Sequence, residues 1–271
     1  IQFRLGMFDP QDKVPYSKIG AEVLESKPHQ QQALKMARQS MVLLKNEKQL
    51  LPLSSKIKKI ALLGPNANNG TTQLGNYNGI PSKNATLLDA LRAEKGIEVV
   101  YDSISDFITL QPGIDLQHYA EKYKDVDLII YAGGISALLE GEEGDTGNVE
   151  GFYRGDRTTI NLPAVQTQVM QMLQKSGKPM IFICMSGSAI AFNWESQHIP
   201  AIIQAWYGGQ AAGTALADIL FGRYNPSGKL PITFYRSDSD LPAIEDYSMK
   251  NRTYRYFNGD VLYPFGYGLS F

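Results

Sequence analysis

Short apolar runs alternate with longer amphipathic segments along most of this chain. The apolar runs lie at 59–64, 97–102, 127–134, 179–185 and 201–207. Apolar residues recur at helical spacing within 31–46, 85–96, 116–125, 162–177 and 209–222. Strands separated by helices of this length cannot pair through tight turns, so they pair mostly in parallel. We therefore predict an α/β fold, a three-layer α/β/α sandwich with a mostly parallel sheet of five or six strands.

The two ends of the chain lack this alternation. Residues 1–27 are interrupted by prolines and a glycine, and they predict a linker rather than a packed unit. Residues 28–235 carry the alternation and predict the sandwich domain. Residues 236–271 are rich in Tyr, Phe, Gly and Asp without a helical period, and we expect them to pack as loops on the rim.

Charge and composition argue against several classes of partner. The chain has 26 Lys and Arg residues against 27 Asp and Glu residues, without a basic block that would attract nucleic acid or an anionic membrane. No apolar run reaches the roughly 18 residues of a membrane-spanning helix. The single cysteine, Cys184, lies in an apolar run, which predicts a buried structural thiol and excludes a disulfide within the chain.

Motifs for several other chemistries are incomplete. The chain contains no GxxxxGK[ST], and its segment GPNANNG lacks the GxGxxG spacing, so a nucleotide site would rest on the sheet type alone. Ser186 and Ser188 lack the glycine two residues earlier that a nucleophile elbow requires. The three histidines, His29, His118 and His198, lie in separate contexts and do not predict a zinc site.

An acidic stretch directly follows the apolar run at 127–139. It places Glu140, Glu142, Glu143 and Asp145 within six positions, in a loop that should lie beyond the carboxyl end of a strand, where ligands approach such sheets. Glycoside hydrolysis needs one carboxyl group that keeps a proton for the leaving oxygen, and crowding by other carboxylates favours that protonated form. The stretch is therefore either a solvated loop or a site that uses a carboxyl proton.

Several motifs, in order, resemble the C-terminal α/β sandwich domain of glycoside hydrolase family 3. They include LLEGEEGD, GDRTTINLPAVQ, AWYGGQAAGTALADILFGRYNPSGKLPITF, RTYRYF and YPFGYGLSF. Upstream, SMVLLKNEKQLLPL and IALLGPNANN also match the family's pattern. The resemblance covers nearly all of the chain. It implies a retaining, exo-acting β-glycosidase of the β-glucosidase or β-xylosidase kind, without a cofactor or metal.

The resemblance also implies how the site is divided. In this family a preceding TIM barrel carries the aspartate nucleophile, and the sandwich carries the general acid/base on a loop. The family's E-x-E element corresponds to residues 140–142, so we expect Glu142 to be the acid/base, with Glu140 second. Glu143 remains a third candidate for the acid/base, because this chain has a longer insertion before the Asp-Arg pair at 156–157 than the family's compact form.

Further expectations follow from the same resemblance. Asn76 and Tyr77 are expected at the rim of the substrate pocket, although turn formation explains the segment GNYNG almost as well. Asp156 and Arg157 are expected to form an ion pair or to brace the loop. The first ten residues resemble the connection after the barrel, so the expected partners are this barrel and a carbohydrate substrate, and the chain alone should be inactive. The family's habit of acting on plant-type glycans suggests a secreted or periplasmic enzyme.

Two other functions stay open at this level. A non-catalytic sandwich that binds carbohydrate or protein would bind sugar with an affinity that does not depend on the acidic loop. A free-standing nucleotide binder of the flavodoxin type would be protected by nucleotide against thermal unfolding.

Overall fold

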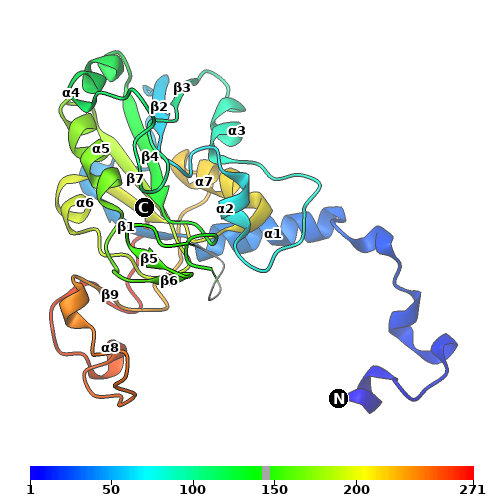
Figure 1. Ribbon diagram of the computed structural model, residues 1–271. Coiled ribbons are helices and arrows are strands. Elements are labelled where there is room, and N and C mark those ends of the chain that lie inside the picture. The colour runs from blue at the N-terminus through cyan, green and yellow to red at the C-terminus, as the bar shows by residue number, and fades with distance from the viewer. Residues whose placement is uncertain (142–146) are drawn as a thin grey trace.

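A six-stranded sheet forms the centre of the protein in the computed structural model, which describes residues 1–141 and 147–271 (Figure 1). The strand order is β1-β8-β7-β4-β2-β3, and all pairs are parallel except β1 with β8. The predicted α/β sandwich is confirmed, with six strands. The strands of this sheet are β1 Val42–Asn46, β2 Lys59–Leu63, β3 Glu98–Asp102, β4 Leu128–Gly134, β7 Met180–Met185 and β8 Ala201–Gln204.

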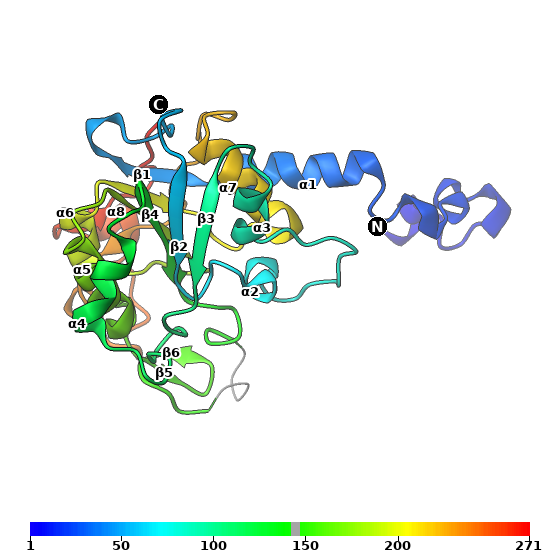
Figure 2. The ribbon, with the colours of Figure 1, turned by 90° about the horizontal axis from the view of Figure 1, so that it is seen from above.

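Helices cover both faces of the sheet (Figure 2). Helices α1, α3 and α7 lie on one face, and α4, α5 and α6 lie on the other. Each set of three helices packs over one cluster of buried side chains. All seven residues of β4 are buried, as expected of a parallel strand covered on both sides. The helices are α1 Lys27–Ser40, α2 Gly70–Leu74, α3 Leu87–Arg92, α4 Leu116–Tyr119, α5 Ala164–Gln174, α6 Asn193–His198, α7 Ala212–Leu220 and α8 Thr253–Tyr256.

The predicted helix over 31–46 is wrong in its last six residues. Helix α1 ends at Ser40, and Val42–Asn46 is strand β1 instead. Backbone hydrogen bonding to β8 outweighs the helical spacing of the apolar residues, because those residues are equally able to fill a strand buried on both faces. Met36, one of the apolar residues at helical spacing in this segment, is 55% exposed.

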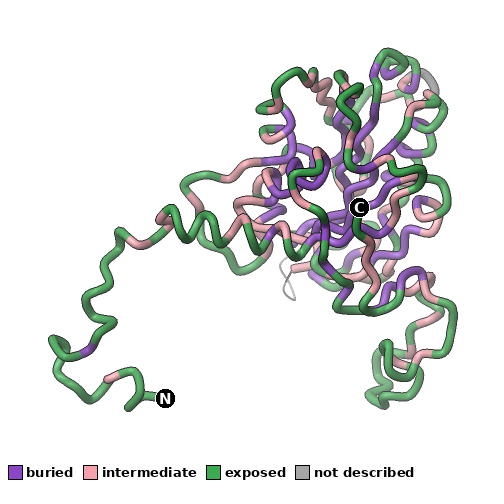
Figure 3. Tube along the Cα trace, turned by 180° about the vertical axis from the view of Figure 1, so that it is seen from behind, coloured by how far each residue is buried: buried purple, intermediate pink, exposed green. Residues whose placement is uncertain are grey.

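The ends of the chain differ in how they meet the sandwich. Residues 1–26 form short 3-10 turns that extend away from the body and are mostly exposed (Figures 1 and 3). The C-terminal segment is more regular than expected, since β9 Phe234–Tyr235 pairs with β10 Val261–Tyr263. Near its end, the amide of Leu269 donates to the carbonyl of Leu43 at 2.8 Å. This bond covers part of the open edge of β1, which would otherwise be free to pair with another strand.

A buried carboxylate ties α1 to α7. Asp218 in α7 is 4% exposed and accepts hydrogen bonds from the Arg38 Nε at 2.7 Å and from the Arg223 Nε at 2.7 Å. Arg223 also pairs with Glu94 next to α3. These carboxylates raise the pKa of the Arg223 guanidinium, so Arg223 keeps its positive charge at physiological pH.

We predict that Asp218→Asn lowers the free energy of unfolding by about 2 kcal/mol, because two guanidinium groups lose their common anionic partner. Urea unfolding of this chain measures the change. The matched control is Asp260→Asn, which removes the 81% exposed partner of Arg236 and should leave the unfolding midpoint unchanged. Equal midpoints for both variants would contradict this account of the network.

Candidate active site

The carboxyl ends of β2, β4, β7 and β8 lie side by side. The acidic loop predicted from the sequence leaves from this side of the sheet, and so does the loop after β2. Two glycines in the left-handed region make the exits possible. Gly64 has φ +99°, and a Cβ there would lie 2.3 Å from the Ala132 carbonyl oxygen. Gly134 has φ +107°, and its Cβ would lie 2.0 Å from the Met185 carbonyl oxygen. Each loop thus begins where neighbouring strands approach too closely for any side chain.

The acidic loop follows β4 and returns through the small hairpin of β5 Phe152–Tyr153 and β6 Asp156–Arg157. Glu142, the predicted acid/base, lies outside the described residues, and so does Glu143. Glu140 lies inside them and is half-buried.

Glu140 is tied into the sandwich through both of its carboxylate oxygens. Its Oε1 accepts hydrogen bonds from the Gly187 amide at 2.6 Å and from the Tyr207 hydroxyl at 2.6 Å. Its Oε2 accepts a hydrogen bond from the Ser188 hydroxyl at 2.5 Å. A carboxylate that accepts from three donors has most of its hydrogen-bonding capacity already occupied. This arrangement suits an anchor better than a proton donor.

Arg157, at the returning end of the same loop, contacts the same serine. Its Nη1 donates to the Ser188 Oγ at 2.8 Å and to the Ala189 carbonyl at 2.7 Å. Arg157 therefore braces the loop, as expected, although through these two residues rather than through an ion pair with Asp156, which is exposed. Burial lowers the pKa of the Arg157 guanidinium, and the charge of Glu140 acts in the opposite direction. We refer to Glu140, Arg157, Ser188 and Tyr207 as the loop clamp.

A strained residue orients the tyrosine of the loop clamp. The predicted strand at 201–207 ends early, at Gln204, and Trp206 has φ +56°. A non-glycine residue in this region costs roughly 1–3 kcal/mol. The Trp206 indole donates to the Ser40 carbonyl at 3.1 Å, which helps to hold this turn. Burial and the neighbouring Glu140 raise the pKa of the Tyr207 phenol, so the hydroxyl keeps the proton that it donates.

The other predicted site residues lie at the neighbouring loop after β2. The Asn76 Nδ2 donates to the Ala137 carbonyl at 2.9 Å, so it joins this loop to the base of the acidic loop. Tyr77 is 86% exposed at the surface. The loop also contains the short helix α2, which the sequence did not predict. Asn76 thus has a structural contact beside the site, and contact of either residue with substrate stays a prediction.

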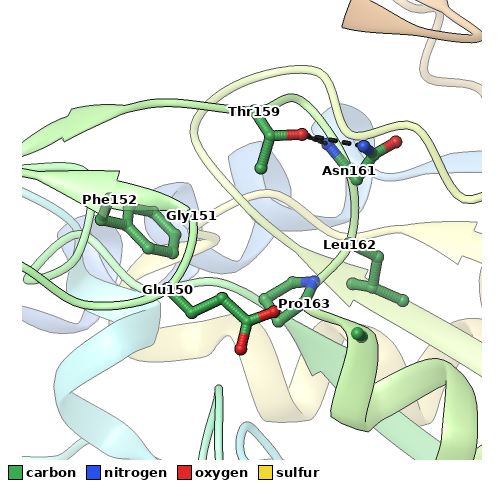
Figure 4. Close-up of a pocket in the computed structure, with 8 residues that line it drawn as sticks. Glu150, Gly151, Phe152, Thr159, Asn161, Leu162 and Pro163 are labelled. Atoms are coloured by element: carbon green, nitrogen blue, oxygen red, sulfur yellow. Dashed lines mark hydrogen bonds between the residues drawn. The ribbon is translucent and has the colours of Figure 1, made fainter.

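Two cavities flank the returning end of the acidic loop. The smaller, about 190 Å³, includes Glu150, Thr159 and Asn161 in its lining (Figure 4). Two of its polar side chains are already paired, because the Thr159 Oγ1 accepts from the Asn161 Nδ2 at 2.8 Å and donates to Asp238 at 2.6 Å. The larger, about 500 Å³, is mainly apolar and reaches Arg157 and Ser188. Only the larger has the size of a typical small-molecule pocket, and it lies against the loop clamp.

A comparison with known protein families decides the identity of this fold. The model described as the glycosyl hydrolase family 3 C-terminal domain matches residues 41–271. The chain belongs to this family. The resemblance inferred from the sequence motifs is confirmed.

Individual family 3 proteins are similar over the whole chain but are much longer. A xylan 1,4-beta-xylosidase of Xylanibacter ruminicola is 32% identical over 412 residues, an alignment that covers 100% of this chain and 48% of that enzyme. A periplasmic beta-glucosidase of Salmonella typhimurium is 31% identical, with 39% of its length covered. A solved family 3 exo-beta-xylosidase superposes with a TM-score of 0.84 at 29% identity, over 100% of this chain and 35% of that one. This chain therefore corresponds to a C-terminal part of such enzymes.

In this family 3 domain, sequence reasoning placed Glu140 in the site but did not identify what holds it. Ser188 was considered only as a nucleophile, and Gly187 was not singled out. Their position directly after a predicted strand was the available signal, because residues at the carboxyl ends of neighbouring parallel strands converge. Among the described residues, no group of three or more His, Cys, Asp or Glu side chains could hold a metal ion. Within the same residues, no helix has the length and apolar character needed to cross a membrane.

Gly187 provides a direct test of the close packing around Glu140. A Cβ at this position would lie 2.9 Å from the Glu140 Oε1 and 3.1 Å from the Tyr207 ring. We predict that Gly187→Ala lowers the free energy of unfolding by about 1–3 kcal/mol, because two held side chains must shift. The control is Gly79→Ala, whose Cβ would meet nothing within 4 Å. Thermal unfolding of the two variants measures this difference in stability. A Gly187→Ala protein as stable as the control would contradict this account of the packing.

Proposed function

We propose that this chain is the acid/base-bearing domain of a retaining exo-β-glycosidase that removes terminal β-linked glucose or xylose. Glu142 donates a proton to the leaving oxygen and then deprotonates the water that hydrolyses the glycosyl-enzyme. The nucleophile is an aspartate of a TIM barrel elsewhere in the longer enzyme. This division agrees with the relatives, which are named xylosidases and glucosidases and are more than twice as long as the matched part.

The observation that carries the proposal is the position of the acidic stretch in a family 3 C-terminal domain. It follows β4 at the carboxyl edge of a parallel sheet, the edge at which such folds bind their ligands. Within the stretch, Glu140 is occupied by three hydrogen-bond donors, which favours Glu142 over Glu140 as the residue that holds a transferable proton.

The proposal includes the dependence on a second domain. Retaining hydrolysis needs two carboxyl groups about 5–5.5 Å apart, and we propose that only one of them belongs to this chain. The chain alone should therefore show no significant hydrolysis of aryl glucosides or aryl xylosides. Because one relative is named a periplasmic beta-glucosidase, we also propose that the enzyme acts in the periplasm or outside the cell.

The test uses the longer enzyme and removes one carboxyl group at a time. We predict that Glu142→Ala lowers turnover of a glycoside with a poor leaving group by about 10²–10⁴-fold, the usual contribution of general acid catalysis. Added azide should restore turnover of an activated aryl glycoside and yield a β-glycosyl azide, because the small anion enters the space left by the carboxylate. The measurements are kcat and product analysis with and without azide.

Two sets of variants accompany this experiment. Glu150→Ala, which removes an exposed glutamate farther along the same loop, should keep wild-type turnover. Glu140→Ala and Glu143→Ala should not give azide product. Rescue of either of these two variants in place of Glu142→Ala would move the acid/base to that position, and the absence of rescue from all three would overturn the proposal.

A further inference from the structure

We propose that Glu140 is a positioning residue and that the loop clamp fixes the place from which the proton donor acts. This inference rests on the proposed function, because it assigns a role to the contacts that surround the acidic loop. It concerns Glu140, Arg157, Ser188 and Tyr207, which all lie within the described residues. None of them is the acid/base of the proposed function.

The first argument is that both ends of the acidic loop meet at one side chain. The Ser188 Oγ donates to the Glu140 carboxylate where the loop leaves and accepts from the Arg157 Nη1 where the loop returns. Residues 141–156 lie between these two contacts. The hydroxyl of Ser188 thus bridges the two ends of the loop, and deleting it removes one hydrogen bond from each end at once.

The second argument is that the Glu140 side chain has little freedom to rotate. Its two oxygens accept from donors on two separate strand ends, Ser188 with Gly187 after β7 and Tyr207 after β8. Its backbone is held as well, since the Glu140 amide donates to the Ser136 carbonyl at 3.1 Å. Glu140 is therefore held at both its side chain and its backbone, which gives the acidic loop a fixed starting point.

The third argument is electrostatic. The Nε and Nη2 atoms of Arg157 are buried without a hydrogen-bond partner in the described part of the chain, so the nearby negative charge of Glu140 compensates a poorly solvated cation. In the proposed mechanism, this negative charge would also raise the pKa of the Glu142 carboxylic acid and help it to keep a proton at neutral pH, because like charges disfavour ionisation. A glutamine at position 140 would preserve the shape and remove both effects.

The experiment compares glycosides whose leaving groups differ in their need for protonation, using the longer enzyme. A dinitrophenyl glycoside leaves without acid assistance, whereas a methoxyphenyl glycoside requires it. We predict that Tyr207→Phe, Ser188→Ala and Glu140→Gln lower kcat/KM by about 10–100-fold for the methoxyphenyl substrate, the cost of misplacing a catalytic group by about 1 Å. For the dinitrophenyl substrate, the loss should stay below about threefold, because no proton transfer is needed.

The pH profile supplies a readout that a purely structural role would not move. The basic limb of kcat/KM reports the pKa of the acid in the free enzyme. Glu140→Gln should shift this limb to lower pH, because the neighbouring negative charge is lost. Tyr207→Phe keeps that charge, so its basic limb should stay closer to that of the wild type.

The matched control is Tyr123→Phe. Its hydroxyl donates to the Asp102 carboxylate at 2.7 Å, the same kind of bond as that of Tyr207 but beside edge strand β3. It should leave kcat/KM unchanged for both substrates. An equal loss on both substrates in the clamp variants, or wild-type values throughout, would overturn the inference.

The outcome also separates this inference from the proposed function. If Glu142→Ala is rescued by azide while the clamp variants keep the wild-type dependence on the leaving group, only the positioning role fails. If Glu140→Ala itself is rescued by azide, Glu140 is the acid/base and the positioning role is overturned. If no variant shows azide rescue, the proposed function fails first.

Discussion

The parallel register of three central strands determines the arrangement of the site. Gly134 of β4 pairs with Met185 of β7, and Cys184 of β7 pairs with Gln204 of β8. The chain therefore leaves the sheet at three adjacent points, and the residues that follow meet within a few positions of each strand end. Glu140, Ser188 and Tyr207 come from these three exits. Their hydrogen bonds are a consequence of the register, and a slip of one strand would separate them.

The same arrangement joins buried strands to the exposed loops at their carboxyl ends. The strands are covered by helices on both faces, and the loops at their ends are free of that packing. Glu140 is half-buried at the boundary between the two regions, where a carboxylate must find donors to offset its lost hydration. It finds them in an amide and two hydroxyl groups. In this way the packed sheet holds the first residue of the acidic loop in place.

Sequence reasoning predicted the parts of this structure that depend on local pattern. The alternation of apolar runs and helices specified the sandwich, and the order of motifs specified the family. The antiparallel strand β1 was missed because Val42, Leu43 and Leu44 suit either a helix or a buried strand. Only the pairing with β8 selects the strand. The left-handed Trp206, which ends β8 early, carries no sequence signal because tryptophan rarely adopts this conformation. The loop clamp escaped prediction for a related reason, since Glu140 and Tyr207 are far apart in sequence and meet only through the register of the sheet.

The central claim is that the loop after β4 carries the proton donor of a two-carboxyl site completed by another domain. A crystal structure of the longer enzyme, with a fluorinated sugar trapped on its nucleophile, tests this most directly by giving the distance between the nucleophilic carboxyl group and the Glu142 carboxyl group. The account predicts a separation of about 5–5.5 Å, the value of retaining enzymes. A distance of more than about 10 Å between these two carboxyl groups would contradict it, because this exceeds even the spacing in inverting enzymes.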